Sequence, residues 1–147
     1  MWKGDSLRMW DEYFNNSVVI GAEIYEERTG GLYLDPNYNV IVHDVTKLSF
    51  LEIIKDISLD VVIDDGSHYL HEQIQTFHLL KNKMNEGGIY IIEDIKDIDY
   101  SRRYFEDCLH HNCEILDLRD VACILKKDAI ATSNKFARDN VLVIYRF

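Results

Sequence analysis

The sequence predicts an α/β fold of three layers, in which helices cover both faces of a mostly parallel sheet. Two observations support this prediction: the apolar segments are short and continuously apolar, and helix-like segments separate them. The chain has 147 residues, of which 47% are hydrophobic. That content is enough for a core, and the length indicates one domain over residues 1–147.

In the first part of the chain, two predicted strands flank a loop-rich segment. A helix that Asp5 or Ser6 caps is expected first, because apolar side chains follow at helical spacing. The strands are predicted near residues 18–20 and 40–42, and each is followed by an acid. Residues 25–39 carry glycine and proline turn signals, which argue against a helix there.

The second part of the chain continues the alternation of helix and strand. A long apolar stripe from Leu70 to Met84 predicts a helix that Gly87-Gly88 ends. The other expected elements are helices near 48–54 and 100–112, and strands near 59–63, 89–92, 114–118 and 141–145.

Acidic residues stand where four successive predicted strands end. They are Glu23, Asp44, Asp64-Asp65 and Glu93-Asp94. Parallel sheets bind ligands at the carboxyl ends of their strands, so we expect a ligand site at this edge. The alternative for any single acid is that it caps the N-terminus of the helix that follows.

Two of these acidic pairs predict a metal site with a base beside it. Neighbouring strands lie about 4.8 Å apart, so Asp64-Asp65 and Glu93-Asp94 can bring their carboxylates together. Clustered carboxylates repel one another, and a hard cation such as Mg²⁺ relieves that repulsion. His68 stands close enough to act as a general base, although an ordinary polar residue at a helix start is the alternative. For Asp64, supporting the site and capping the helix both stay open.

Composition narrows the classes of partner and compartment. The formal charge is −10, from 26 acidic and 16 basic residues, which repels nucleic acid. No segment has the length of a membrane span, so no membrane partner is expected. The three cysteines form no C-x-x-C motif, which favours a reducing cytoplasm.

Five segments, in order over residues 4–95, resemble the class I S-adenosylmethionine-dependent methyltransferases. The most similar type is the macrocin and mycinamicin sugar O-methyltransferases, whose relatives include cephalosporin hydroxylase-like proteins. The segments are "GDSLRMWDEYF", "VVIGAEI", "VIVHDV", "DVVIDDGSHYLHEQIQTFHLL" and "NEGGIYIIEDI". The resemblance implies a Rossmann-like sheet with an antiparallel last strand.

The resemblance also implies a role for each matching residue. Glu23 would accept hydrogen bonds from the ribose hydroxyls of S-adenosylmethionine, Asp44 would face the adenine amino group, and Val45 would lie against the ring. Gly4 and Ser6 match the end of the loop that holds the methionine part. The implied metal ligands for Mg²⁺ are Asp65, Glu93 and Asp94, and the implied general base is His68.

The same resemblance implies that a strand is missing. The family's opening strand and its glycine-rich motif should precede Gly4, so an N-terminally shortened form without its first central strand is expected. The leading hypothesis is a Mg²⁺-dependent O-methyltransferase that acts on a hydroxylated small molecule, with sugars as one class. The alternative is a non-catalytic remnant that serves as a binding or interaction domain. The sequence leaves open whether the chain forms a homo-oligomer.

Overall fold

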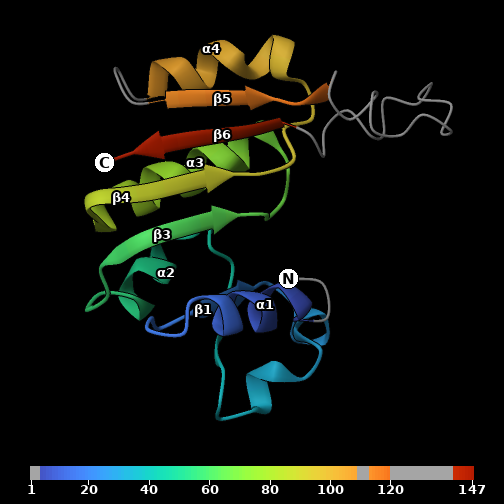
Figure 1. Ribbon diagram of the computed structural model, residues 1–147, viewed down its shortest axis with the longest axis vertical. Helices are drawn as coiled ribbons and strands as arrows, with labels where there is room; N and C mark the ends of the chain where they lie inside the picture. The colour runs from blue at the N-terminus through green and yellow to red at the C-terminus, as the bar shows by residue number, and fades with distance from the viewer. Residues whose placement is uncertain (1–3, 109–112, 120–140) are drawn as a thin grey trace, which may run out of the picture. The chain divides into compact units, whose positions relative to one another are not determined.

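A computed structural model describes residues 4–108, 113–119 and 141–147 of the chain (Figure 1). The chain forms two compact units, unit 1 over Met1–Lys55 and unit 2 over Asp56–Phe147. Within the described residues, no helix combines the length and the apolar character that crossing a bilayer requires.

Unit 1 contains a parallel pair of strands. Its elements are α1 (Asp5–Tyr13), β1 (Ile20–Glu23), η1 (Glu26–Thr29), η2 (Leu32–Leu34), β2 (Asn39–Val42) and α2 (Leu48–Ile53). Glu23 is in register with Val42, so β1 and β2 end at the same edge. The short 3₁₀ turns η1 and η2 occupy the segment in which the sequence predicts turns in place of a helix.

Helix α1 begins at Asp5, and the prediction that Asp5 or Ser6 caps it is wrong. Gly4 is the N-cap residue at φ 75°, and no side chain caps the helix. A Cβ on Gly4 would lie 2.4 Å from Leu32 Cδ1 and 2.7 Å from the carbonyl oxygen of Thr29. This close approach and the positive φ both require glycine, and they set the helix start one residue earlier than the polar pattern indicates.

Unit 2 contains a four-stranded mixed sheet. Its elements are β3 (Leu59–Asp64), α3 (Leu70–Leu80), η3 (Lys81–Lys83), β4 (Met84–Ile92), α4 (Ile98–Cys108), β5 (Cys113–Asp117) and β6 (Val141–Arg146). The strand order is β3-β4-β6-β5, which can be followed in Figure 1. Strand β3 runs parallel to β4, whereas β6 runs antiparallel to both β4 and β5. The predicted antiparallel last strand is therefore confirmed.

An aromatic cluster joins the helices of unit 2 to its sheet. Tyr90 and Tyr145 are paired residues of β4 and β6, and both are fully buried. The ring of Phe77 in α3 lies 4.3 Å from the ring of Tyr145 and 5.2 Å from that of Tyr90. The Tyr145 hydroxyl donates a 3.0 Å hydrogen bond to the carbonyl of Phe105 in α4. Large rings dominate this core, with each buried hydroxyl hydrogen-bonded.

The expected helix end at Gly87-Gly88 is wrong, because this pair lies inside β4. Helix α3 ends at Leu80, and the strand begins at Met84. Gly87, at φ 81°, donates to the carbonyl of Phe147 at 2.8 Å, and Phe147 donates to the carbonyl of Gly88 at 3.0 Å. The pairing of β3 with β4 changes register at this point, as at a β-bulge.

Among the described residues, the strands form two separate sheets. Strand β1 pairs only with β2, and β3 pairs only with β4.

Candidate functional site

The ends of β3 and β4 bring the acidic pairs of unit 2 together. Asp64 is in register with Ile92, and the backbone N–H of Glu93 donates a 3.0 Å hydrogen bond to the carbonyl of Asp64. Asp65 and Asp94 therefore leave the sheet from adjacent strands, as the parallel pairing predicts.

Three side chains from these strand ends form a cluster. Asp65, His68 and Asp94 each offer one ligand atom, and these atoms all lie within 4.8 Å of one another. The Nε2 atom of His68 lies 3.8 Å from Oδ2 of Asp94. His68 and Asp94 are half-buried, whereas Asp65 is exposed. The structure thus brings together three of the four residues predicted for the metal and base site.

The backbone is strained at two of the three cluster residues. His68 and Asp94 both have φ 55°, and no other described residue except glycine has a positive φ. Such a conformation costs on the order of 1–3 kcal/mol and persists only where the surrounding structure enforces it. Backbone strain of this kind is concentrated at functional sites. Here both strained residues belong to the same cluster of side chains.

Glu93 lies outside the group of three but is affected by its charge. Burial raises the pKa of the Glu93 carboxyl, and the negative charges of Asp65 and Asp94 raise it further. Its carbonyl accepts a 3.0 Å hydrogen bond from Nε2 of the buried Gln73. The assignment of Glu93 as a metal ligand stays a prediction.

Asp64 holds the turn that carries Asp65 and His68. Its Oδ1 accepts a 3.1 Å hydrogen bond from the backbone N–H of Gly66, and its Oδ2 accepts a 3.2 Å hydrogen bond from the Tyr90 hydroxyl. Burial raises the pKa of Asp64 to about 6, although both hydrogen bonds oppose this shift. The N-cap residue of α3 is Tyr69. Asp64 therefore supports the turn and does not cap the helix.

The imidazole of His68 presents one nitrogen to the carboxylates. Its Nδ1 is buried and has no hydrogen-bond partner among the described residues. Its Nε2 is the atom near Asp94, so proton exchange with a ligand at the cluster would use Nε2.

In unit 1, the carboxylates at the strand ends accept hydrogen bonds from residues one or two positions further along the sequence. Glu23 is buried, and its Oε1 accepts a 2.8 Å hydrogen bond from the backbone N–H of Ile24. Oδ1 of Asp44 accepts hydrogen bonds from the hydroxyl and the backbone N–H of Thr46, at 2.7 and 3.0 Å. The Thr46 hydroxyl is the main reason that the pKa of Asp44 lies below its usual value.

The remaining residues predicted to bind the cofactor also lie in unit 1. Gly4 precedes α1, Ser6 is half-buried in its first turn, and Val45 is half-buried directly after Asp44. Their proposed roles stay predictions.

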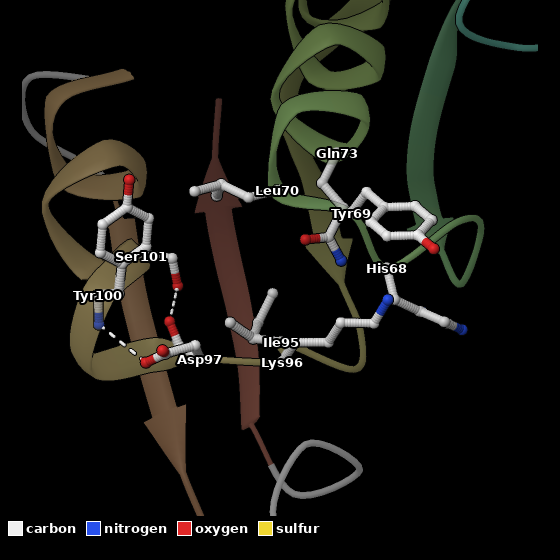
Figure 2. A pocket seen from close by; sticks show the side chains of 9 residues that line it. All are labelled: His68, Tyr69, Leu70, Gln73, Ile95, Lys96, Asp97, Tyr100 and Ser101. Atoms are coloured by element: carbon white, nitrogen blue, oxygen red, sulfur yellow. Dashed lines mark hydrogen bonds between the residues drawn. The ribbon is translucent and has the colours of Figure 1, made fainter.

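A pocket of about 200 Å³ adjoins His68 in unit 2 (Figure 2). Sequence reasoning missed it, because its walls come from segments more than twenty residues apart. Gln73 was the available signal: it is a polar side chain on the apolar stripe of α3, three residues after Leu70 and four before Phe77. A polar residue at a core-facing position indicates a specific buried partner, here the carbonyl of Glu93.

Comparison with known proteins supports the resemblance to sugar O-methyltransferases. The chain is 34% identical over 95 residues to 8-demethyl-8-alpha-L-rhamnosyl tetracenomycin-C 2'-O-methyltransferase of Streptomyces olivaceus, covering 63% of this chain and 24% of that protein. It is 33% identical over 97 residues to demethylmacrocin O-methyltransferase of Streptomyces fradiae, covering 64% and 24%. The chain thus spans about a quarter of the length of these relatives. No protein-family model matches it.

Solved structures show the same fold. MycE methyltransferase of the mycinamycin pathway, in complex with Mg, SAH and mycinamycin VI, matches 99% of this chain and 41% of its own, with a TM-score of 0.64 and 22% identity. A SAM-dependent methyltransferase from Archaeoglobus fulgidus matches 99% of this chain and 82% of its own, with a TM-score of 0.60 and 15% identity. The predicted fold class is confirmed.

Proposed function

We propose that this chain is an O-methyltransferase domain that depends on S-adenosylmethionine and Mg²⁺ and acts on a hydroxyl of a small molecule, with a sugar as the favoured class. The observation that carries the proposal is the cluster of Asp65, His68 and Asp94, two of which have strained backbones. The similarity to sugar O-methyltransferases over about two thirds of the chain supports the same activity.

The donor set fits a hard divalent cation. Asp65 and Asp94 each offer a carboxylate oxygen, and these two atoms lie within 4.8 Å of one another, so that one ion could contact both. Asp65, Glu93 and Asp94 would supply the carboxylate oxygens. Burial is the main cause of the raised pKa of Glu93, and the charges of Asp65 and Asp94, which a cation would offset, add to it.

The chain's own residues would position the acceptor and take its proton. When bound, Mg²⁺ lowers the pKa of a coordinated hydroxyl. His68 would accept the hydroxyl proton at Nε2, and the acceptor oxygen would then take the methyl group from the sulfonium of the donor as S-adenosylhomocysteine leaves. Positioning of the two reactants would supply much of the rate enhancement.

The methyl donor would be held by residues of unit 1. The Glu23 carboxylate would accept from both ribose hydroxyls. Oδ1 of Asp44 is already engaged by Thr46, so the adenine amino group would donate to Oδ2, which lies 3.5 Å from Nζ of Lys47. Gly4 and Ser6 would lie near the methionine part.

Calorimetric titration with S-adenosylhomocysteine, with and without Mg²⁺, tests the proposal. Binding of S-adenosylhomocysteine is expected. An absence of heat at millimolar ligand would contradict the proposed enzymatic function and favour a non-catalytic binding domain.

The variant His68→Ala separates the role of a base from that of a metal ligand. Turnover should fall by about 10²-fold or more, while the affinities for Mg²⁺ and for S-adenosylhomocysteine stay within a factor of about two. The matched control is His78→Ala, an exposed histidine on α3. A parallel loss of Mg²⁺ affinity in His68→Ala would instead make His68 a ligand, and unchanged turnover would reject both roles.

The compartment and the other partners stay predictions. We propose a cytoplasmic location, because the three cysteines of the sequence form no C-x-x-C motif. The side chain of Cys108 and residue Cys123 lie outside the described part. The expectations of no nucleic-acid partner, no membrane partner and an open oligomeric state remain as the sequence predicts them.

A further inference from the structure

Where the parallel pairing of β3 with β4 ends, side chains take over its hydrogen bonds. The N–H of Glu93 donates to the carbonyl of Asp64 at 3.0 Å, which extends the parallel pattern one residue past β4. If the pattern continued, the N–H of Gly66 would donate to the carbonyl of Glu93. Gly66 donates instead to Oδ1 of Asp64, and the Glu93 carbonyl accepts from Nε2 of Gln73 in α3.

The amide of Gln73 is suited to hold this carbonyl because it is buried. Gln73 is only 3% exposed, and its side chain can be followed from the first turn of α3 in Figure 2. If the amide were removed, water could not readily replace it, and the carbonyl of Glu93 would lose its partner. The penalty for an unpaired buried carbonyl is of the same order as the cost of a strained backbone residue. One hydrogen bond from Gln73 is therefore strong enough to maintain strain in the residue that follows Glu93.

The residue that follows is Asp94, which has φ 55°. The angle φ describes the rotation of Asp94 relative to the planar peptide group that it shares with Glu93. A hydrogen bond to the carbonyl of that peptide group fixes one side of this rotation. In the observed conformation, Oδ2 of Asp94 lies 3.8 Å from Nε2 of His68. The bond from Gln73 thus bears on the direction in which the Asp94 carboxylate leaves the backbone.

We propose that Gln73 is a positioning residue for the cluster of Asp65, His68 and Asp94. Its amide holds the peptide group between Glu93 and Asp94, and this peptide group keeps Asp94 in the conformation that brings its carboxylate into the cluster. Gln73 carries no charge, so it acts on the cluster through the backbone. The inference rests on the proposed function for the identity of the bound ion as Mg²⁺.

The backbone of Asp94 in metal-free protein tests the first step. Gln73→Met keeps the length and approximate volume of the side chain and removes its N–H donor. In NMR spectra, the scalar couplings and carbon chemical shifts of Asp94 report its φ. We expect the left-handed conformation in wild type and a shift toward the ordinary negative φ in Gln73→Met. An unchanged left-handed signature in the variant would refute the proposal.

The affinity for Mg²⁺, measured by calorimetry, tests the second step. Gln73→Met should lower this affinity about tenfold, because a residue that orients a metal ligand typically has an effect of that size. The affinity for S-adenosylhomocysteine should stay within a factor of about two, since its proposed site lies in unit 1. Wild-type affinity for Mg²⁺ in Gln73→Met would contradict the positioning role.

The matched control is Thr76→Val. Thr76 is buried on the same helix, three residues after Gln73, and this change also exchanges a polar group for an apolar one. The Mg²⁺ affinity of the control and the NMR signature of Asp94 should match those of wild type. Equal effects of the two substitutions would rule the proposal out, because a general disturbance of α3 would then account for both.

A second variant decides the question if Gln73→Met does not fold. Gln73→Asn keeps the amide but is shorter by one methylene, so it withdraws the donor from the Glu93 carbonyl without placing an apolar group against it. The same change at Asp94 and a similar fall in Mg²⁺ affinity, about tenfold, are expected. Gln73→Asn that behaves as wild type in both measurements would overturn the proposal.

A double substitution shows whether Gln73 acts through Asp94. In protein that already carries Asp94→Asn, Gln73→Met should weaken Mg²⁺ binding by no more than about twofold. A further loss of about tenfold would show that the two residues act independently, because independent effects add in free energy, and the proposal would fail.

These measurements separate the inference from the proposed function. If wild-type protein binds no Mg²⁺ but Asp94 changes conformation in Gln73→Met, the metal-dependent part of the proposed function fails and the backbone role of Gln73 stands. If wild-type protein binds Mg²⁺ and both Gln73 variants bind it equally well, the proposed function stands and the positioning role fails.

Discussion

Both units place acids at the carboxyl ends of parallel strands, but the surroundings of these acids differ, and the pKa values of Asp44 and Glu93 shift in opposite directions. In unit 1, Asp44 accepts two hydrogen bonds from Thr46, and its pKa lies below the usual value. In unit 2, burial and the charges of Asp65 and Asp94 raise the pKa of Glu93. Asp44 of unit 1 bonds to donors two residues along the same chain, whereas Asp65 and Asp94 of unit 2 lie near each other and near Glu93.

The sequence shows the same pattern in both units, an acid at the end of a strand. The difference in surroundings distinguishes acids suited to recognising polar groups from acids suited to binding a cation. A carboxylate with its own donors is held in the ionised form and in one orientation, which suits the recognition of hydroxyl or amino groups. Carboxylates that face one another are stabilised by a cation. The comparison therefore favours unit 2 for the metal and unit 1 for the methyl donor.

The largest predicted effect is on metal binding in unit 2. Asp94→Asn removes one charge from the cluster, and asparagine tolerates the positive φ of this position. We expect the affinity for Mg²⁺ to fall about 100-fold or more, measured by calorimetry.

A charge-matched control makes this result specific. Glu86→Gln removes one exposed carboxylate from β4, the strand that precedes Asp94. Its Mg²⁺ affinity should stay within a factor of about two of the parent. Equal losses in both variants would indicate that overall charge, and not the cluster, attracts the ion.

The second prediction concerns the stability of unit 2 at different pH. The pKa of Asp64 is about 6 in the folded protein against an ordinary value of 3.8, so the folded state binds more protons between these values. This contribution to stability is present below pH 3.8 and is lost as the pH rises through 6. Asp64→Asn removes the ionisation and retains an oxygen for Gly66.

The expected result is a change in the pH dependence of unfolding. Relative to wild type, Asp64→Asn should gain about 2 kcal/mol in unfolding free energy on going from pH 4 to pH 8, as urea denaturation measures it. The same stability difference between variant and wild type at both pH values would contradict the raised pKa.

The fold could be read largely from local pattern, because most strands of the sheets are apolar segments, and the first four end in an acid or shortly before one. The exceptions depend on distant contacts. The apolar stripe of α3 continues to Met84, but backbone bonds from Gly87 and Gly88 to Phe147 place that segment in a strand. The start of α1 depends likewise on the fit of Gly4 against Leu32.

In the candidate site, too, some features follow from local sequence and others depend on distant contacts. Strand ends and spacing predicted that the pairs Asp64-Asp65 and Glu93-Asp94 meet near His68, and one acid of each pair, Asp65 and Asp94, lies in the cluster with His68. The function of Asp64 was not predictable, because it depends on the hydroxyl of Tyr90, which is 26 residues away. Local sequence locates the acids, but their hydrogen-bond donors decide what each one does.

The smallest predicted effect tests, in unit 1, whether hydrogen-bond donors decide the role of an acid. Asp44→Ala removes the acceptor of both Thr46 hydrogen bonds and should lower the unfolding free energy by about 1 kcal/mol at pH 7. Because the folded pKa of Asp44 is lowered, its contribution is present above the ordinary pKa and is lost as the pH falls through the folded value. The cost of Asp44→Ala should therefore shrink in strong acid, whereas the benefit of Asp64→Asn should grow in mild base. If both variants respond to pH with the same sign, the contrast between the two units is wrong, since only opposite environments produce opposite slopes.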